Sequence, residues 1–185
     1  GTAALPTYTK RRAWALRFTL GSGFGGHRAT APMGKLASRP VRWGPDLQTW
    51  RVASRLYRAA NSLPAGPKKT IWGAKQMAWL TRTILASDAS FRVLISPTPI
   101  VGPDRPRGKN DNHSNAAFAT EGNHFRSWTR QHKLENFFVC CGDRHWQYLS
   151  IDPATGLREF SCGPASDEHA GGDRQSTRLN SSHVV

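Results

Sequence analysis

A short apolar run that ends in a glycine, an acid and a histidine constrains the fold of this chain more than any other feature. The run Phe137–Cys141 leads into Gly142, and Asp143 and His145 follow directly. An apolar run of this length bounded by glycine predicts a buried strand, and open α/β sheets place their chemistry at the carboxyl ends of such strands. A carboxylate and an imidazole two residues apart suit a hard or borderline metal ion. The pattern therefore predicts a metal-binding pair, with a polar turn as the alternative.

Residues 41–172 alternate between helical and extended patterns. Apolar residues at helical spacing predict two helices, one over 74–86 and one with its apolar stripe at Phe118, Phe125 and Trp128. Alternation and bounding turns predict five strands, at 47–52, 91–95, 137–141, 147–151 and 158–162. Helices that alternate with strands and give way to a short meander predict α/β layers closed by antiparallel strands.

The two ends of the chain differ from this central region. Residues 1–40 are basic, contain no acidic residue, and hold a glycine-rich stretch at 21–26 that lacks the lysine-hydroxyl ending of a phosphate-binding loop. We assign this segment no function and expect it to be a disordered arm or a frameshifted stretch. Residues 173–185 resemble one reading frame of a common DNA sequencing adaptor, so we expect a non-native tail and a native chain that continues beyond Gly172.

The net charge of +14 raises the alternative of a nucleic-acid-binding protein. Seven basic residues lie in the first forty positions, and the central region carries a more ordinary excess. We therefore expect no nucleic-acid partner. No run of about 18 apolar residues occurs, so we expect no transmembrane segment. The three cysteines, Cys140, Cys141 and Cys162, are too few for a disulfide framework, and the first two should point to opposite faces of their strand.

Two further groups of polar residues could serve a reaction. Asp111 and His113 lie in a dense polar loop before a helix, and either side chain could reach a phosphate or a metal; a helix cap and turn is the alternative. Arg55 and Arg58 have the planar donor geometry that suits phosphate oxygens, although they could also be surface residues. Asp167 and His169 form a weaker candidate pair, with a solvated turn as the alternative.

The central region resembles the C-terminal part of the alkaline phosphatase D, or PhoD-like, metallophosphatases. The likeness covers about two thirds of the chain, with its blocks in the family's order. The blocks are Val41-Arg-Trp-Gly-Pro-Asp-Leu-Gln48, Thr70-Ile-Trp-Gly-Ala-Lys-Gln-Met-Ala-Trp-Leu80, Val93-Leu-Ile-Ser-Pro-Thr-Pro-Ile-Val-Gly-Pro-Asp104, and a last block from Cys141-Gly-Asp-Arg-His-Trp-Gln-Tyr148 to Gly172.

This resemblance implies part of a four-layer α/β/β/α metallophosphatase sandwich with a two-metal centre that hydrolyses phosphate mono- or diesters. Two cations about 3.5–4 Å apart can activate a hydroxide and hold both reacting oxygens, and calcium, iron, manganese and zinc all fit the description. Asp143 and His145 match the family's late ligand block. The family's earlier ligand blocks are absent, so we expect an incomplete centre in this chain. Family members are usually exported, which implies a periplasmic or extracellular location.

Overall fold

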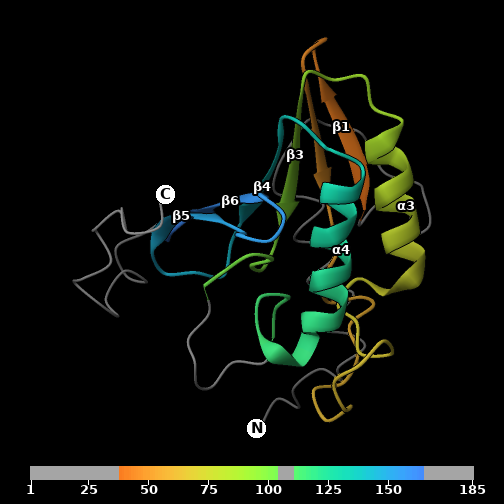
Figure 1. Cartoon of the computed structure of the whole chain (residues 1–185), viewed down its shortest axis with the longest axis vertical. Helices are drawn as coiled ribbons and strands as arrows, with labels where there is room; N and C mark the ends of the chain where they lie inside the picture. The colour runs from red at the N-terminus through yellow and green to blue at the C-terminus, as the bar shows by residue number, and fades with distance from the viewer. Residues whose placement is uncertain (1–37, 104–110, 165–185) are drawn as a thin grey trace, which may run out of the picture.

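The computed structural model describes residues 38–103 and 111–164 of the chain (Figure 1). These residues form one mixed sheet of six strands and two α-helices. A short 3-10 turn precedes the second helix. In chain order the elements are β1 (Arg39–Trp43), β2 (Leu47–Arg51), α3 (Gly73–Leu85), β3 (Phe91–Ser96), η1 (Ala116–Phe118), α4 (Ala119–Gln131), β4 (Phe137–Cys141), β5 (Gln147–Ile151) and β6 (Arg158–Cys162). The expected α/β class and all seven elements expected from the sequence are confirmed.

The strand order β1-β2-β3-β4-β6-β5 corrects the expected meander. Strands β2, β3, β4 and β6 are parallel, and β5 runs antiparallel to β6 at one edge. The chain leaves β4, passes to the edge as β5, and returns so that β6 lies between them. Alternating side chains specify which face a strand buries and not which strand lies beside it, so the sequence pattern did not reveal this exchange of neighbours.

Strand β1 was not expected from the sequence and begins inside the unassigned basic segment, at Arg39. It pairs antiparallel with β2 at the other edge of the sheet, with Pro40 opposite Trp50. Proline lacks an N–H and is confined to edge strands or bulges within sheets. The proline that weakens the strand pattern in the sequence is thus compatible with the edge position that the strand occupies.

The core lies between the sheet and the two helices, which pack on the same face of it. Trp50, Leu94 and Val139 occupy successive register positions on β2, β3 and β4, and all three are fully buried. Leu80 and Ile84 of α3 and Phe125 of α4 complete this cluster. The apolar stripes expected on both helices therefore face the sheet, as amphipathic helices require.

The opposite face of the sheet is also apolar but exposes its side chains. Alternation along the strands places one set of large hydrophobic residues on this face, each between 38% and 48% exposed: Trp43, Phe91, Ile95, Leu149, Ile151 and Phe160. Parallel strands are typically covered on both faces. The described part of the chain thus consists of two layers, the helices and the sheet. The face of the sheet that the helices do not cover is apolar.

No helix in the described part of the chain is long and apolar enough to cross a membrane. Cys140 and Cys141 point to opposite faces of β4, as expected, and both are free thiols, as is Cys162. Burial and the negative charge of Glu159 raise the pKa of Cys141 to about 12. A thiol held protonated in this way is a poor nucleophile, so Cys141 serves as a core residue.

Candidate functional site

The carboxyl ends of four parallel strands meet along one edge of the sheet, and the predicted metal ligands lie there. Ser96 ends β3 opposite Cys141, which ends β4, and the Gly142 N–H donates to the Ser96 carbonyl over 3.1 Å. Asp143 and His145 lie within three residues after Gly142 in the chain. Asp143 and His145 therefore lie on the loop after a buried strand, as predicted. Their role as metal ligands stays a prediction.

The turn between β4 and β5 exposes both predicted ligands while burying the residue between them. Asp143 and His145 are exposed, whereas Arg144 is only 6% exposed and its guanidinium lies 5.3 Å from the centre of the Trp146 ring. Asp143 adopts a left-handed backbone with φ of 68°, a conformation uncommon outside glycine and more accessible to Asp and Asn. The side chains of Asp143 and His145 are therefore accessible to a ligand from solvent.

Arg55 and Arg58 lie in the segment that follows β2, which ends at the same edge of the sheet as β4. Arg55 is exposed. Arg58 is half-buried and donates to the Asp111 carbonyl over 3.4 Å and to Asn61 Oδ1 over 2.6 Å. The structure thus brings together one predicted phosphate-binding residue, Arg58, and one predicted catalytic residue, Asp111. The Arg58 guanidinium also lies 5.0 Å from the centre of the Phe118 ring.

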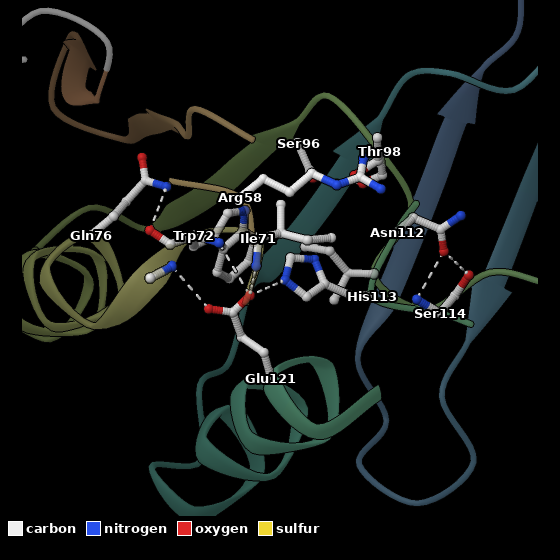
Figure 2. A network of polar contacts seen from close by, with 12 residues as sticks. Arg58, Ile71, Trp72, Gln76, Ser96, Thr98, Asn112, His113, Ser114 and Glu121 are labelled. Atoms are coloured by element: carbon white, nitrogen blue, oxygen red, sulfur yellow. Dashed lines mark hydrogen bonds and ion pairs between the residues drawn. The ribbon is translucent and has the colours of Figure 1, made fainter. Parts of the chain in front are cut away.

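His113 is fully buried, in contrast to the other predicted site residues. Its Nε2 lies 2.8 Å from Oε2 of Glu121 on α4, and its ring packs 4.4 Å from Trp72 (Figure 2). The other ring nitrogen, Nδ1, is buried and has no hydrogen-bond partner among residues 38–103 and 111–164. This geometry is typical of a histidine held by a carboxylate, and it encloses the imidazole rather than presenting it to solvent.

Glu121 forms the centre of this network and was not identified from the sequence. Its carboxylate accepts the backbone N–H groups of Ile71, Trp72 and Gly73 at 2.6, 3.1 and 3.1 Å (Figure 2). Burial opposes ionisation, but the hydrogen bond and charge of His113, with the N–H donors, outweigh it and lower the pKa of Glu121. Because a carboxylate only accepts hydrogen bonds when ionised, His113 Nε2–H is the donor.

Glu159 on β6 repeats this arrangement at a second turn. Its carboxylate accepts the N–H groups of Ile100, Val101 and Gly102 at 2.6, 3.0 and 2.9 Å, and the Tyr148 hydroxyl donates to it over 2.9 Å. Glu159 is fully buried beside Val139 in the register of the sheet. The turn that it holds follows β3 directly, so Glu159 positions backbone next to the candidate site.

Gly122 permits the close approach of α4 to the loop that carries His113. A Cβ atom at this position would lie 2.4 Å from the His113 carbonyl oxygen. We expect Gly122→Ala to lower the free energy of unfolding by about 1–3 kcal/mol, although the same change stabilises most helix interiors. Urea unfolding followed by circular dichroism measures this value.

The exposed Ser127 on the same helix provides the matched control. Ser127→Ala should change the free energy of unfolding by no more than about 0.5 kcal/mol. If Gly122→Ala stabilised the protein, the close approach between α4 and the His113 carbonyl would not exist in solution.

The described residues supply a partial donor set for a metal. Within residues 38–103 and 111–164, no group of three or more His, Cys, Asp or Glu side chains is arranged to hold an ion. The turn after β4 supplies one carboxylate and one imidazole, whereas protein metal sites generally use three or more ligands. Asp143 and His145 therefore supply about half of the ligands that a metal site needs. Asp167 and His169 lie outside the described residues.

Comparisons with known proteins place this geometry in context. A family model described as "PhoD-like phosphatase" matches residues 28–184. A solved structure titled "Structure of PhoD" matches with a TM-score of 0.57 and 18% sequence identity, covering 68% of this chain and 28% of that one. At this identity the match establishes a shared fold, and the chain spans little more than a quarter of the matched structure. The comparison with curated proteins found no match.

Proposed function

The chain belongs to the PhoD-like phosphatase family, and from this premise we propose that it supplies one part of a metal-dependent phosphoesterase site. The observation that carries the proposal is the position of Asp143 and His145, exposed on the turn after β4, where the parallel strands of the sheet end. Ligands in open α/β sheets bind at that edge. The reaction proposed is hydrolysis of phosphate mono- or diesters by the full-length protein.

Asp143 and His145 are the residues that would hold a metal. They are exposed and extend from one turn, with the buried Arg144 between them. One carboxylate and one imidazole are compatible with calcium, iron, manganese or zinc. A bound metal would supply an activated water and a positive charge for the phosphoryl oxygens. The remaining ligands of a two-metal centre would come from residues beyond this chain.

Arg55 and Arg58 would contact the phosphate, since guanidinium groups match phosphate oxygens with two donors. Arg58 is held beside Asp111 by its bond to that residue's carbonyl. The sequence predicts Asp111 and His113 as catalytic residues. For His113, the enclosed bond to Glu121 favours a positioning role, in which the imidazole holds the loop that carries Asp111.

The exposed apolar face of the sheet supports the proposal that this chain is a fragment of a larger domain. Six large hydrophobic residues on that face are each more than a third exposed to solvent. A contiguous exposed apolar surface of this kind marks an interface. In the four-layer sandwich proposed for the full-length protein, a second sheet would cover it. The same missing portion would carry the ligand blocks that this sequence lacks.

The test compares the isolated chain with the full-length protein that contains it. We expect residues 1–185 to show negligible turnover of a chromogenic phosphodiester with calcium, iron, manganese or zinc added. In the full-length protein, His145→Ala should reduce kcat/KM by about 100-fold or more, because even residues that only orient metal ligands contribute 10–100-fold. His124→Ala, at an exposed position on α4, should leave kcat/KM unchanged.

Two results would contradict the proposal in different ways. Turnover by residues 1–185 that disappears in His145→Ala would show that the centre is complete in this chain. Unchanged turnover by His145→Ala in the full-length protein would remove the residue from the site.

A further inference from the structure

A hollow of about 430 Å³ lies at the edge of the sheet opposite the candidate phosphoesterase site. It is open to solvent and is lined by the turn between α4 and β4 and by the turn between β5 and β6. The parallel strands β4 and β6 begin here, at Phe137 and Arg158, whereas Asp143 and His145 lie beyond the other end of β4. Its volume falls within the range of about 300–1,000 Å³ that small-molecule sites occupy.

The hollow combines apolar and cationic side chains. Leu134, Phe137 and Leu157 supply the apolar part, and the last two are almost completely buried. Arg130 and Lys133 are cationic, against a single acidic residue, Glu135. Arg158 also lines the hollow, but its guanidinium lies 4.8 Å from the centre of the Phe138 ring. The lining is more polar than apolar and carries an excess of positive charge. It therefore favours a small ligand with a negative charge.

Hydrogen bonds hold both turns in place. Arg130 reaches from α4 to the other turn and donates to the Ala154 carbonyl over 2.6 Å. On the α4 side, the Leu134 N–H donates to Thr129 over 3.1 Å, and on the other side the Gly156 N–H donates to Asp152 over 2.7 Å. A site that is already ordered loses less entropy when a ligand binds.

The geometry points to a second binding site in this hollow, separate from the phosphoesterase site, for a small organic anion with one carboxylate or phosphonate-like group. Lys133 and Arg130, which line the hollow, would recognise the negative charge. This inference does not depend on the proposed phosphoesterase function, because none of its residues belongs to that site.

Binding of four small probes to the 185-residue chain tests this site. Benzoate and phenylphosphonate carry the negative charge, benzamide is the neutral analogue, and benzylamine is the cationic one. In amide chemical-shift titrations, the two anions should perturb Asn136, Thr155 and Gly156 and bind with a Kd of ~1 mM. Benzamide and benzylamine should bind at least fivefold more weakly.

Two substitutions at Lys133 provide a matched pair. Lys133 has a left-handed backbone with φ of 47°, which asparagine tolerates well. Lys133→Asn should weaken benzoate binding about fivefold, since it removes a charge-assisted contact, and Lys133→Arg should retain it. The exposed Lys75 on α3 serves as the remote control, and Lys75→Gln should have no effect.

Specific results would overturn the inference. Benzamide binding as tight as benzoate binding would exclude recognition of the negative charge. Anion-induced shifts that appear only around Asp143 and His145, with none at Gly156, would place binding at the other edge of the sheet. Equal benzoate affinity in Lys133→Asn and Lys133→Arg would exclude the role of the cation.

Discussion

Glu121→Ala is expected to lower the free energy of unfolding by about 4 kcal/mol. The change removes the acceptor of three backbone N–H groups, those of Ile71, Trp72 and Gly73, and of the His113 imidazole. A buried donor left without a partner costs about 1–3 kcal/mol. The total stability of a domain is about 5–15 kcal/mol, so this one substitution should remove much of it.

The effect is large because Glu121 caps a helix far away in the sequence. Helix α3 begins at Gly73, its N-cap residue Trp72 makes no side-chain capping bond, and its first turn contains no acidic residue. The first N–H groups of a helix have no partner within the helix, and the positive end of its dipole favours an anion. Glu121 on α4 supplies both the acceptor and the charge.

The pH dependence of stability follows from the lowered pKa of Glu121. An unfolded chain with a pKa near 4.5 binds the proton more readily than the folded chain does. The contribution of the carboxylate to stability is therefore complete above about pH 4.5 and is lost as the pH falls through the lower folded value. The stability difference between the wild type and Glu121→Gln should stay constant from neutral pH down to about pH 4.5 and shrink as the pH falls further to about pH 3.

Urea unfolding across this pH range measures both effects. Glu135→Gln is the matched control, because Glu135 is exposed and its substitution should change stability by no more than about 0.5 kcal/mol. A wild-type advantage over Glu121→Gln that stayed constant from pH 7 to pH 3 would show that the carboxylate is not ionised in the network described here.

Glu159→Ala is expected to destabilise the protein by a similar amount, about 4 kcal/mol, for the same physical reason at a different turn. It would leave the N–H groups of Ile100, Val101 and Gly102 without their acceptor in the core. Tyr148→Phe should cost less, about 1–1.5 kcal/mol, because Glu159 keeps its three backbone donors. Burial and the charge of Glu159 raise the pKa of Tyr148, so its hydroxyl remains a donor at all ordinary pH values.

Native-state hydrogen exchange separates the two carboxylates. In Glu159→Ala, the amides of residues 100–102 should lose protection through local opening, while those of residues 71–73 keep theirs. Glu121→Ala should give the opposite pattern, so each variant serves as the control for the other. Loss of protection at both turns in both variants would mean that the two networks open as one unit.

The elements of this fold were predictable because their signals are local. The stripe that includes Leu80 and Ile84 predicted α3, and the alternation around Trp50 predicted β2; all these residues are buried where they were expected. Strand β1 was missed because Pro40 interrupts its pattern. The order of β5 and β6 was missed because side-chain alternation carries no information about strand neighbours.

The candidate site was predictable only in part. The glycine and polar residues after β4 indicated a loop at the carboxyl edge, and that loop lies where it was expected. His113 was identified as a candidate from the polar loop, yet its enclosure against Trp72 and Glu121 could not be seen in the sequence. Glu121 itself gave no signal, because it looks like any acidic residue in the first turn of a helix.

Apart from β1, the sequence alone determined which segments are helices and strands and which side of each is apolar. It also determined to which family the chain belongs, since periodicity and ordered motifs are read from neighbouring residues. Tertiary structure alone decided how two buried carboxylates are used. Glu121 accepts hydrogen bonds from residues 48 to 50 positions away, and Glu159 from residues 57 to 59 positions away. A buried charge is stable only when several donors converge on it, and such convergence exists only after the chain has folded.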